Sequence, residues 1–248
     1  MPFTLAAFRQ ATTAAVTLSP IDALADPHIR VSGKDIWVPE ALPMLAGYMA
    51  LGATLTLGRL ESPTLRALVP INVIPINAST EPLSPPACVL QPKTPKAIGG
   101  GEALNFIATD TAADEIKCLV WFCDGPITPV TGEIFTVRAV ATGTLTANAW
   151  TNLAITFDQA LPKGRYQVVG MAAMSAGLVA ARLVAPGYAW RPGCIGCDAV
   201  SDIPASEMRM GNMGVWCEFD HDLPPTVDFL SISADTNPVV WLDLIKIA

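Results

Sequence analysis

The sequence predicts an all-β protein: an antiparallel β-sandwich or jelly roll with a smaller N-terminal β-rich part. Short runs of β-branched and aromatic residues recur after residue 101, and turn sequences such as Asp124-Gly125-Pro126 separate them. No convincing amphipathic helix pattern lies between these runs. Before them, residues 79–101 hold five prolines and three consecutive glycines in 23 positions.

This proline- and glycine-rich stretch sets the predicted domain organisation. Proline has no amide hydrogen to donate to a helix or sheet, and glycine loses the most backbone entropy on ordering. We therefore expect no regular element through it. The predicted parts are an N-terminal arm or short helix (1–25), a β-rich part (26–78), a linker (79–101) and a jelly-roll sandwich (102–248).

The strand patterns before the linker are mixed. The residues around Ser32-Gly33 predict a small hairpin. Residues 42–57 are apolar nearly throughout; their start fits a helix or a buried strand, and their end favours a strand. Pro70 and Pro75 interrupt a β-branched run, which predicts an edge strand or bulges.

Nine strands are expected after the linker, at the spacing typical of an antiparallel sandwich. They lie near Leu104–Ala108, Ile116–Phe122, Ile134–Ala141, Thr151–Phe157, Gly164–Ala173, Leu178–Val184, Val215–Asp220, Val227–Ile232 and Val239–Ile247.

Composition favours a subunit packed among neighbours. Hydrophobic residues make up 51% of the chain and charged residues 15%, so a monomer has few charges with which to cover itself. The net charge is −7, and no cluster of Lys and Arg offers the counterion release that nucleic-acid binding needs. We therefore expect copies of this chain as partners, and no direct nucleic-acid binding.

The N-terminus carries apolar residues without the pattern of a membrane or secretion segment. No run reaches 18 uninterrupted apolar residues, and the first residues lack a cationic start. Phe3 and Phe8 are candidates to dock on a neighbouring copy, with a frayed terminus as the alternative.

Residues 185–213 show no strand pattern, and a long excursion in a compact sandwich is typically a contact loop. Tyr188, Trp190, Arg191 and Arg209 belong to the residue types that favour interfaces. The alternative is a loop that folds back over its own sheet.

Sequence motifs of catalysis are missing. The two histidines, His28 and His221, stand in no recognised nucleophile motif, and neither a G-x-S-x-G nor a phosphate-binding loop occurs. We expect no enzymatic activity and no cofactor.

Cys194, Cys197, Cys217 and His221 resemble a zinc-ligand set. A four-residue step along a strand spans about 13 Å, whereas two ligands of one zinc lie within about 4 Å. A zinc site, a Cys194–Cys197 redox or disulfide pair, and buried or loop thiols stay open, and we favour the thiols.

Glu218, Asp220 and Asp222 share one face if they lie in a strand. Three carboxylates on one face suit Ca²⁺ or a general acid and base. We favour the remaining interpretation, a solvated strand face at the margin of a sheet.

The segment from Thr146 to Gly177 has an aromatic turn, a strand, a Leu-Pro-x-Gly turn and a Tyr-bearing strand. This order resembles jelly-roll modules of viral capsid and spike proteins, and also sugar-binding sandwich domains. The resemblance covers about 30 residues and concerns their strand–turn–strand arrangement.

A jelly-roll or double jelly-roll capsid protein of an icosahedral phage is the first choice on this resemblance. It implies a self-assembling virion subunit, for which trimers are one expected form, with other virion proteins as further partners and the virion as its location. The alternative is a carbohydrate-binding sandwich of a phage fibre or a secreted or cell-surface adhesin, with exposed aromatics at Tyr188 and Trp190. A cupin-like metalloenzyme is a third class, thinly supported by two histidines.

Overall fold

A computed structural model describes residues 2–68, 70–73, 75–76, 89–197 and 208–247. Nearly all the regular structure in this part of the chain is β-strand, which confirms the predicted all-β class; its one α-helix is α1 (Pro63–Leu68). The chain divides into two compact units. We call Thr4–Pro126 the N-terminal unit, and the residues from Ile127 onward, to which Phe3 also belongs, the C-terminal unit.

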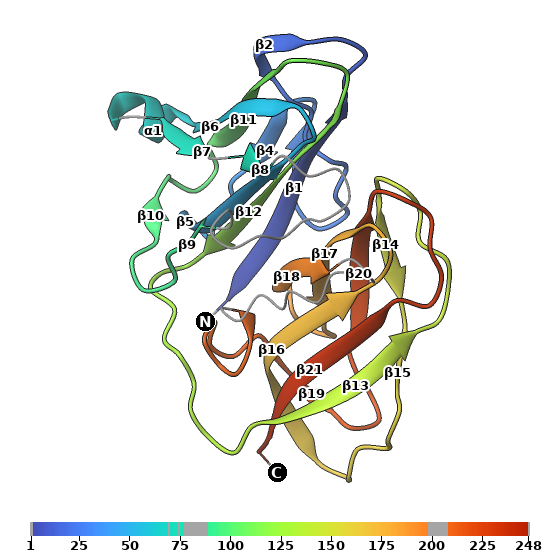
Figure 1. Cartoon of the computed structure of the whole chain (residues 1–248). Helices are drawn as coiled ribbons and strands as arrows, with labels where there is room; N and C mark the ends of the chain where they lie inside the picture. Colours follow the sequence, from blue (N-terminus) through green and yellow to red (C-terminus); the bar gives the residue numbers. More distant parts are fainter. Residues whose placement is uncertain (1, 69, 74, 77–88, 198–207, 248) are drawn as a thin grey trace. The chain divides into compact units, whose positions relative to one another are not determined.

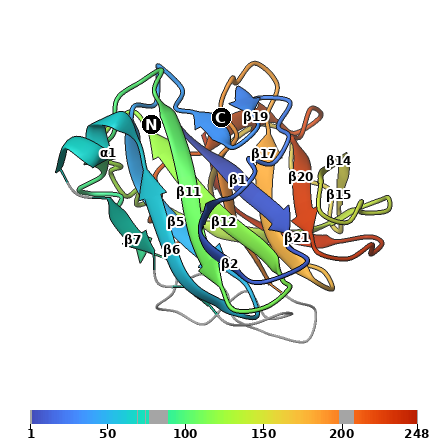
Figure 2. The same ribbon diagram turned by 90° about the horizontal axis from the view of Figure 1, so that it is seen from above.

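Two six-stranded antiparallel-rich sheets form the N-terminal unit within the described residues. The first contains β1 (Phe3–Ala11), β12 (Glu115–Cys123), β5 (Met44–Leu51), β10 (Lys96–Ala97), β9 (Val89–Leu90) and β8 (Pro75–Ile76). The second contains β3 (Val31–Ser32), β4 (Asp35–Trp37), β11 (Ala103–Asp110), β6 (Leu55–Glu61), β7 (Ile71–Val73) and β2 (Val16–Pro20). Figure 2 shows β11 and β6 running side by side.

Burial follows the sequence pattern of these strands. Leu104, Phe106 and Ala108 alternate along β11 and are fully buried, which is the period-2 pattern of a strand with one face on the core. β12 is buried at every residue after Glu115, so it lies at the centre of its sheet with both faces covered.

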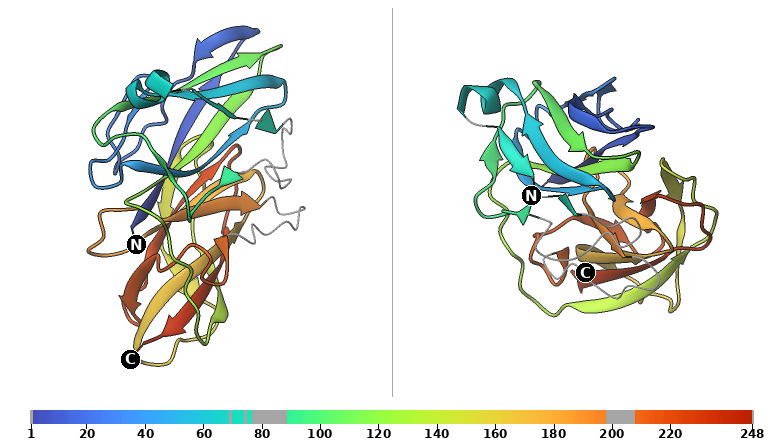
Figure 3. Two further views of the ribbon diagram at one scale, coloured as in Figure 1. Left: turned by 90° about the vertical axis from the view of Figure 1, so that its left-hand side faces the viewer. Right: turned by 45° about the horizontal axis from the view of Figure 1, so that its top comes forward.

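A nine-stranded sheet forms the C-terminal unit in the described chain, in the order β14-β20-β17-β18-β16-β21-β13-β15, with β19 on β16. The strands are β13 (Phe135–Ala141), β14 (Trp150–Leu153), β15 (Ile155–Phe157), β16 (Arg165–Met174), β17 (Leu178–Val184), β18 (Gly193–Cys197), β19 (Cys217–Asp220), β20 (Thr226–Ser231) and β21 (Val239–Lys246). β16, β21 and β13 lie side by side in Figure 1, and Figure 3 shows the same strands from two further directions.

The two ends of this nine-stranded sheet are joined by the chain itself. β14 stands at one end of the strand order and β15 at the other, yet only Ala154 separates them in sequence. One extended segment therefore pairs with β20 through its first half and with β13 through its second half. The sheet is nearly closed on itself, with β16, β17, β20 and β21 supplying its buried side chains.

All nine strands predicted after residue 101 are present, but the first two belong to the N-terminal unit. β11 pairs with β6, and β12 pairs with β5. The division of the structure therefore falls after Pro126, in contrast to the linker expected at residues 79–101. Backbone pairing over six or seven residues determines this division, and local sequence does not reveal such long-range partners.

The expected linker also contains regular structure in its described part, residues 89–101. The short strands β9 and β10 both pair with β5, which corrects the expectation that no element runs through this stretch. Each is only two residues long, as the neighbouring prolines dictate. Residues 79–88 of the linker lie outside the described residues.

The expected N-terminal arm or short helix (1–25) is wrong, because β1 and β2 occupy this region as strands. The hairpin around Gly33 is confirmed as β3 and β4. Residues 42–57, whose start fitted a helix or a strand, contain β5 and the start of β6.

Residues 185–213 were expected to contain no strand, and β18 corrects this. β18 pairs antiparallel with β17 and parallel with β16, so it bridges two parts of the sheet. Its sequence, GCIGC, contains a single β-branched residue and therefore gives little strand signal. Residues 198–207 of this stretch lie outside the description.

Candidate functional site

The two N-terminal interface candidates are buried. Phe3 and Phe8 are both 0% exposed, because β1 is a core strand. The Phe3 ring packs edge-on against Trp216 with centroids 5.2 Å apart, and the Phe8 ring packs on Phe106 at 6.0 Å. Neither phenylalanine is available to dock on a neighbouring copy, so this expectation is wrong.

Arg209 forms an ion pair within the C-terminal unit. Its guanidinium donates to both carboxylate oxygens of Asp243, with N···O distances of 2.6 and 2.8 Å, and the Met210 amide donates to Asp243 at 2.9 Å. Asp243 is fully buried. Burial alone would raise the pKa of this carboxyl group, but the hydrogen bonds from Arg209, Met210 and Thr136 outweigh it and lower the pKa. Arg209 therefore fastens its segment to β21.

Three further candidates form one group beside β19. The rings of Tyr188 and Trp190 meet edge-on at 5.2 Å, and both side chains are half-buried. Arg191 is buried and donates to the backbone carbonyls of Tyr188 and Trp190. The Glu218 amide donates to the Tyr188 hydroxyl at 3.1 Å. Arg191 thus holds the aromatic pair in place, and only the pair keeps exposed surface for a partner.

The proposed zinc ligands are not brought together. Cys197 lies opposite Met174 of β16, whereas Cys217 lies opposite Val168, six residues along the same strand. Six residues of strand span about 20 Å. No group of three or more His, Cys, Asp or Glu residues in the described chain could hold a metal ion.

The described cysteines are all buried. Burial raises the pKa of Cys217 to about 12 and that of Cys123 to about 11. Burial also raises the pKa of Cys194 and Cys118. These thiols are therefore protonated and weakly nucleophilic at neutral pH.

The acidic run does not form one carboxylate face. β19 ends at Asp220, so Asp222 lies beyond the strand. Glu218 accepts hydrogen bonds from Arg165 at 3.0 Å and Gln167 at 2.9 Å, and Arg165 also lies 3.8 Å from Asp220. The favoured interpretation, a strand face at the margin of a sheet, matches these cross-strand ion pairs.

The two histidines belong to different units. The backbone amide of His28 donates to Asp26 in a loop of the N-terminal unit. His221 Nδ1 lies 3.8 Å from Asp222 in the turn after β19.

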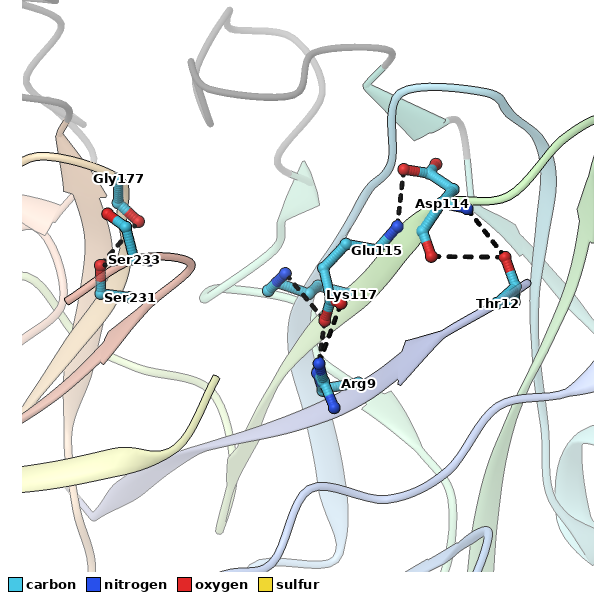
Figure 4. A network of polar contacts seen from close by, with 8 residues as sticks. All are labelled: Arg9, Thr12, Asp114, Glu115, Lys117, Gly177, Ser231 and Ser233. Carbon is cyan, nitrogen blue, oxygen red and sulfur yellow. Dashed lines mark hydrogen bonds and ion pairs between the residues drawn. The ribbon is translucent and has the colours of Figure 1, made fainter. Parts of the chain in front are cut away.

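A polar network fixes the edge strand of the N-terminal unit (Figure 4). Glu115 accepts from Arg9 of β1, with one N···O distance of 2.9 Å, and lies 3.3 Å from the Lys117 ammonium. Asp114 and Thr12 bond one another at the adjoining turn. Figure 4 also shows Ser231 of the C-terminal unit, whose hydroxyl donates to the Gly177 carbonyl at 3.1 Å.

Sequence reasoning missed a pair of exposed apolar side chains at one end of the C-terminal unit. Leu223 is 58% exposed and Ile247 is 41% exposed. The Ile247 amide donates to the Arg165 carbonyl, and Arg165 lies opposite Asp220, to whose carbonyl the Leu223 amide donates. Both residues thus lie beside the start of β16. Single apolar residues in turns have no periodicity that would reveal them.

An open groove along β13 was also missed. One part has a volume of about 600 Å³ and the other about 320 Å³, and both are lined by Thr136, Val137 and Gln159. The groove is built from β13, β21 and residues 158–162, which follow β15. It therefore belongs entirely to the C-terminal unit.

Comparisons with known proteins give little support for an assignment. No family model matched the sequence, and neither did any curated protein. Among solved structures, the crystal structure of the major capsid protein P2 from bacteriophage PM2 is similar, with 10% identity, a TM-score of 0.25, and coverage of 99% of this chain and 98% of that one. A likeness of this size carries no argument by itself. In the described residues, no helix has the length and apolarity to cross a membrane.

Proposed function

We propose that this chain is a non-catalytic structural subunit of a virion, which assembles with copies of itself into a shell. The observation that supports it best is the exposed apolar pair, Leu223 and Ile247, at one end of the C-terminal unit. The buried carboxylates Asp228 and Asp243 of this unit are each bound to an arginine, so exposed apolar surface is the better candidate to drive association.

Rigid walls are the first requirement of a shell subunit. In the C-terminal unit the extended segment through Ala154 joins both ends of the sheet, and Arg182 and Asp228 form a buried ion pair across neighbouring strands at 2.9 Å. The paired interior groups favour one arrangement over others. The link through Ala154 leaves few unpaired strand edges.

Association energy is the second requirement. Burial of apolar surface contributes roughly 25 cal/mol per Å², so a contact centred on two side chains is weak when made once. Many copies of one weak contact add up in a closed assembly. With a net charge of −7, we expect the inner face to touch a membrane or another protein layer in place of bare nucleic acid.

Sedimentation velocity over a concentration series, with electron micrographs of the same samples, tests this proposal. We expect oligomers, including trimers, or shell fragments for the natural chain. The double variant Leu223→Gln and Ile247→Gln should shift the distribution toward monomer.

Leu18→Gln is the matched control, because Leu18 is 50% exposed but belongs to the N-terminal unit. It should leave the distribution unchanged. A natural chain that stays monomeric at the highest concentration, with no particles in the micrographs, would refute the proposal.

A further inference from the structure

The groove along β13 exists because its two neighbouring strands differ in length. β15 ends at Phe157, which lies opposite Ala139, whereas β13 begins at Phe135. The chain after β15 turns away, so residues 158–162 form a second wall facing the uncovered start of β13.

The narrower part of this groove combines an indole with planar polar groups. Trp241 of β21 lies opposite Arg138 of β13 in the sheet, and both line the cavity of about 320 Å³. Asp158 and the exposed amide of Gln159 line it from the other side. The Arg138 guanidinium is hydrogen-bonded to the Asp158 carboxylate.

This combination suits a sugar ring. The apolar face of a pyranose packs on an indole, whose ring offers a large, flat apolar surface. Its hydroxyl groups both donate and accept, and a guanidinium, a carboxylate and an amide supply both functions in fixed planes. Clefts of a few hundred Å³ with a few convergent polar groups are the usual form of a small-ligand site.

We propose that the groove binds a neutral oligosaccharide, with one sugar ring on Trp241 and its hydroxyls bonded to Gln159 and the Arg138–Asp158 pair. The wider part, lined by Phe135, Leu161 and Ile245, takes the next rings of the chain. This binding activity goes beyond a role in the shell and does not depend on it.

Charge at the narrower part favours a neutral sugar. Arg138 and Asp158 are similarly exposed, at 43% and 41%, and their opposite charges cancel at short range. An acidic sugar would have to compete with Asp158 for the guanidinium. The groove therefore presents hydrogen-bonding capacity with little net charge.

An extended peptide is a weaker fit to the same groove. Strand addition needs free backbone groups along the edge of β13. The Asp158 amide already donates to the Arg138 carbonyl at 3.1 Å, and Ala139, Val140 and Ala141 are paired with β15. The backbone next to Trp241 is thus already occupied, and side chains remain as the recognition groups.

A glycan array with neutral and acidic oligosaccharides, followed by titration of the best ligand with intrinsic tryptophan fluorescence, tests the proposal. We expect binding of at least one neutral oligosaccharide. Trp241→Ala and Gln159→Ala should each raise its Kd about tenfold or more, since a lost stacking contact or hydrogen bond of about 1.4 kcal/mol has that effect.

Trp190→Ala is the matched control, because Trp190 is a half-buried tryptophan of the same unit that lies outside the groove. It should keep the Kd of the natural chain. Circular dichroism checks that the variants fold; because Gln159 is an exposed loop residue, its variant remains informative if Trp241→Ala does not fold.

Three results would overturn the proposal. The first is an array on which no neutral glycan binds, the second is binding restricted to acidic glycans or to peptides, and the third is a Kd that both groove variants leave unchanged.

Discussion

The two units of this chain differ in how they protect sheet edges and where they keep charge. In the N-terminal unit a loop covers the outer edge of β1: the Arg9 amide donates to the Asp22 carbonyl, and the Leu24 amide donates to the Ala7 carbonyl. In its main charge network, the side chains of Arg9 and Glu115 are 29% and 30% exposed, and only Lys117 is buried. In the C-terminal unit the chain links the two ends of the sheet directly, and the unit contains two ion pairs with a buried carboxylate, Arg182–Asp228 and Arg209–Asp243.

The two units are both built from strands, but they should differ in how much stability they lose when an ion pair is broken. A half-exposed charge that loses its partner is solvated by water, whereas a buried one is not. The two buried ion pairs of the C-terminal unit should therefore respond much more strongly to the loss of one charged partner.

Arg182→Met should have the largest effect. The Arg182 side chain is 0% exposed, donates to Asp228 at 2.9 Å and stacks over Trp150 at 4.0 Å. Its removal leaves the Asp228 carboxylate buried without its guanidinium partner, which lowers the free energy of unfolding by about 3–5 kcal/mol. Urea unfolding followed by tryptophan fluorescence measures it.

Arg138→Met is the control for this variant, because Arg138 belongs to an ion pair in the same unit that is about two-fifths exposed. This variant should lower the free energy of unfolding by less than about 1 kcal/mol. Equal losses for the two variants would contradict the proposed role of burial.

Asp243→Asn should have an intermediate effect that depends on pH. At neutral pH the variant weakens hydrogen bonds from the charged Arg209, at a cost of about 2 kcal/mol. The folded-state pKa of Asp243 is lowered, so its ionised form stabilises the unit above the unfolded pKa of about 3.9, and this contribution is lost as the pH falls through the folded value.

The difference between Asp243→Asn and the natural chain should therefore shrink in acid. Unfolding curves measured between neutral pH and pH values below the unfolded pKa detect this. A difference that stays constant over the whole range would argue against an ionised Asp243 in the folded protein.

Lys117→Met in the N-terminal unit should have the smallest effect at neutral pH, below about 1 kcal/mol. Methionine matches the buried stem of the lysine, and Glu115 keeps its bonds to Arg9. Burial lowers the pKa of Lys117, although Glu115 raises it in part. The folded state thus loses its proton before the unfolded state, and stability should rise with pH up to about 10.4.

Alkaline unfolding curves give the decisive readout for Lys117. The natural chain should gain stability as the pH rises toward the unfolded lysine pKa, and Lys117→Met should lack this gain. A gain that persists in the variant would show that other groups cause it.

Local sequence predicted the strands well because alternation and turn chemistry act over a few residues. The nine strands after residue 101 and the hairpin at Gly33 were found in this way. The pairing of β11 and β12 with β6 and β5 was not, since contacts between residues far apart leave no local pattern. β18 was not predicted because its sequence, GCIGC, has little strand propensity.

The candidate sites were harder to predict than the strands. Phe3 and Phe8 were predicted to form a docking arm, but both are buried in the core. Arg209 was predicted to lie at an interface, but it binds Asp243. Trp241 lies in an apolar strand, where its sequence neighbours indicate only a core position. Its access to the groove follows from where β15 ends, which no local pattern specifies.

In the C-terminal unit, the single residue Ala154 links the two strands at opposite ends of the sheet. A protease that cut the chain there would leave β14 and β15 attached to opposite margins of an opened ribbon, each with a new free end. Such ribbons could join end to end and grow as fibres. Because Ala154 is exposed, we expect cleavage at this residue to favour such polymers over a discrete building block.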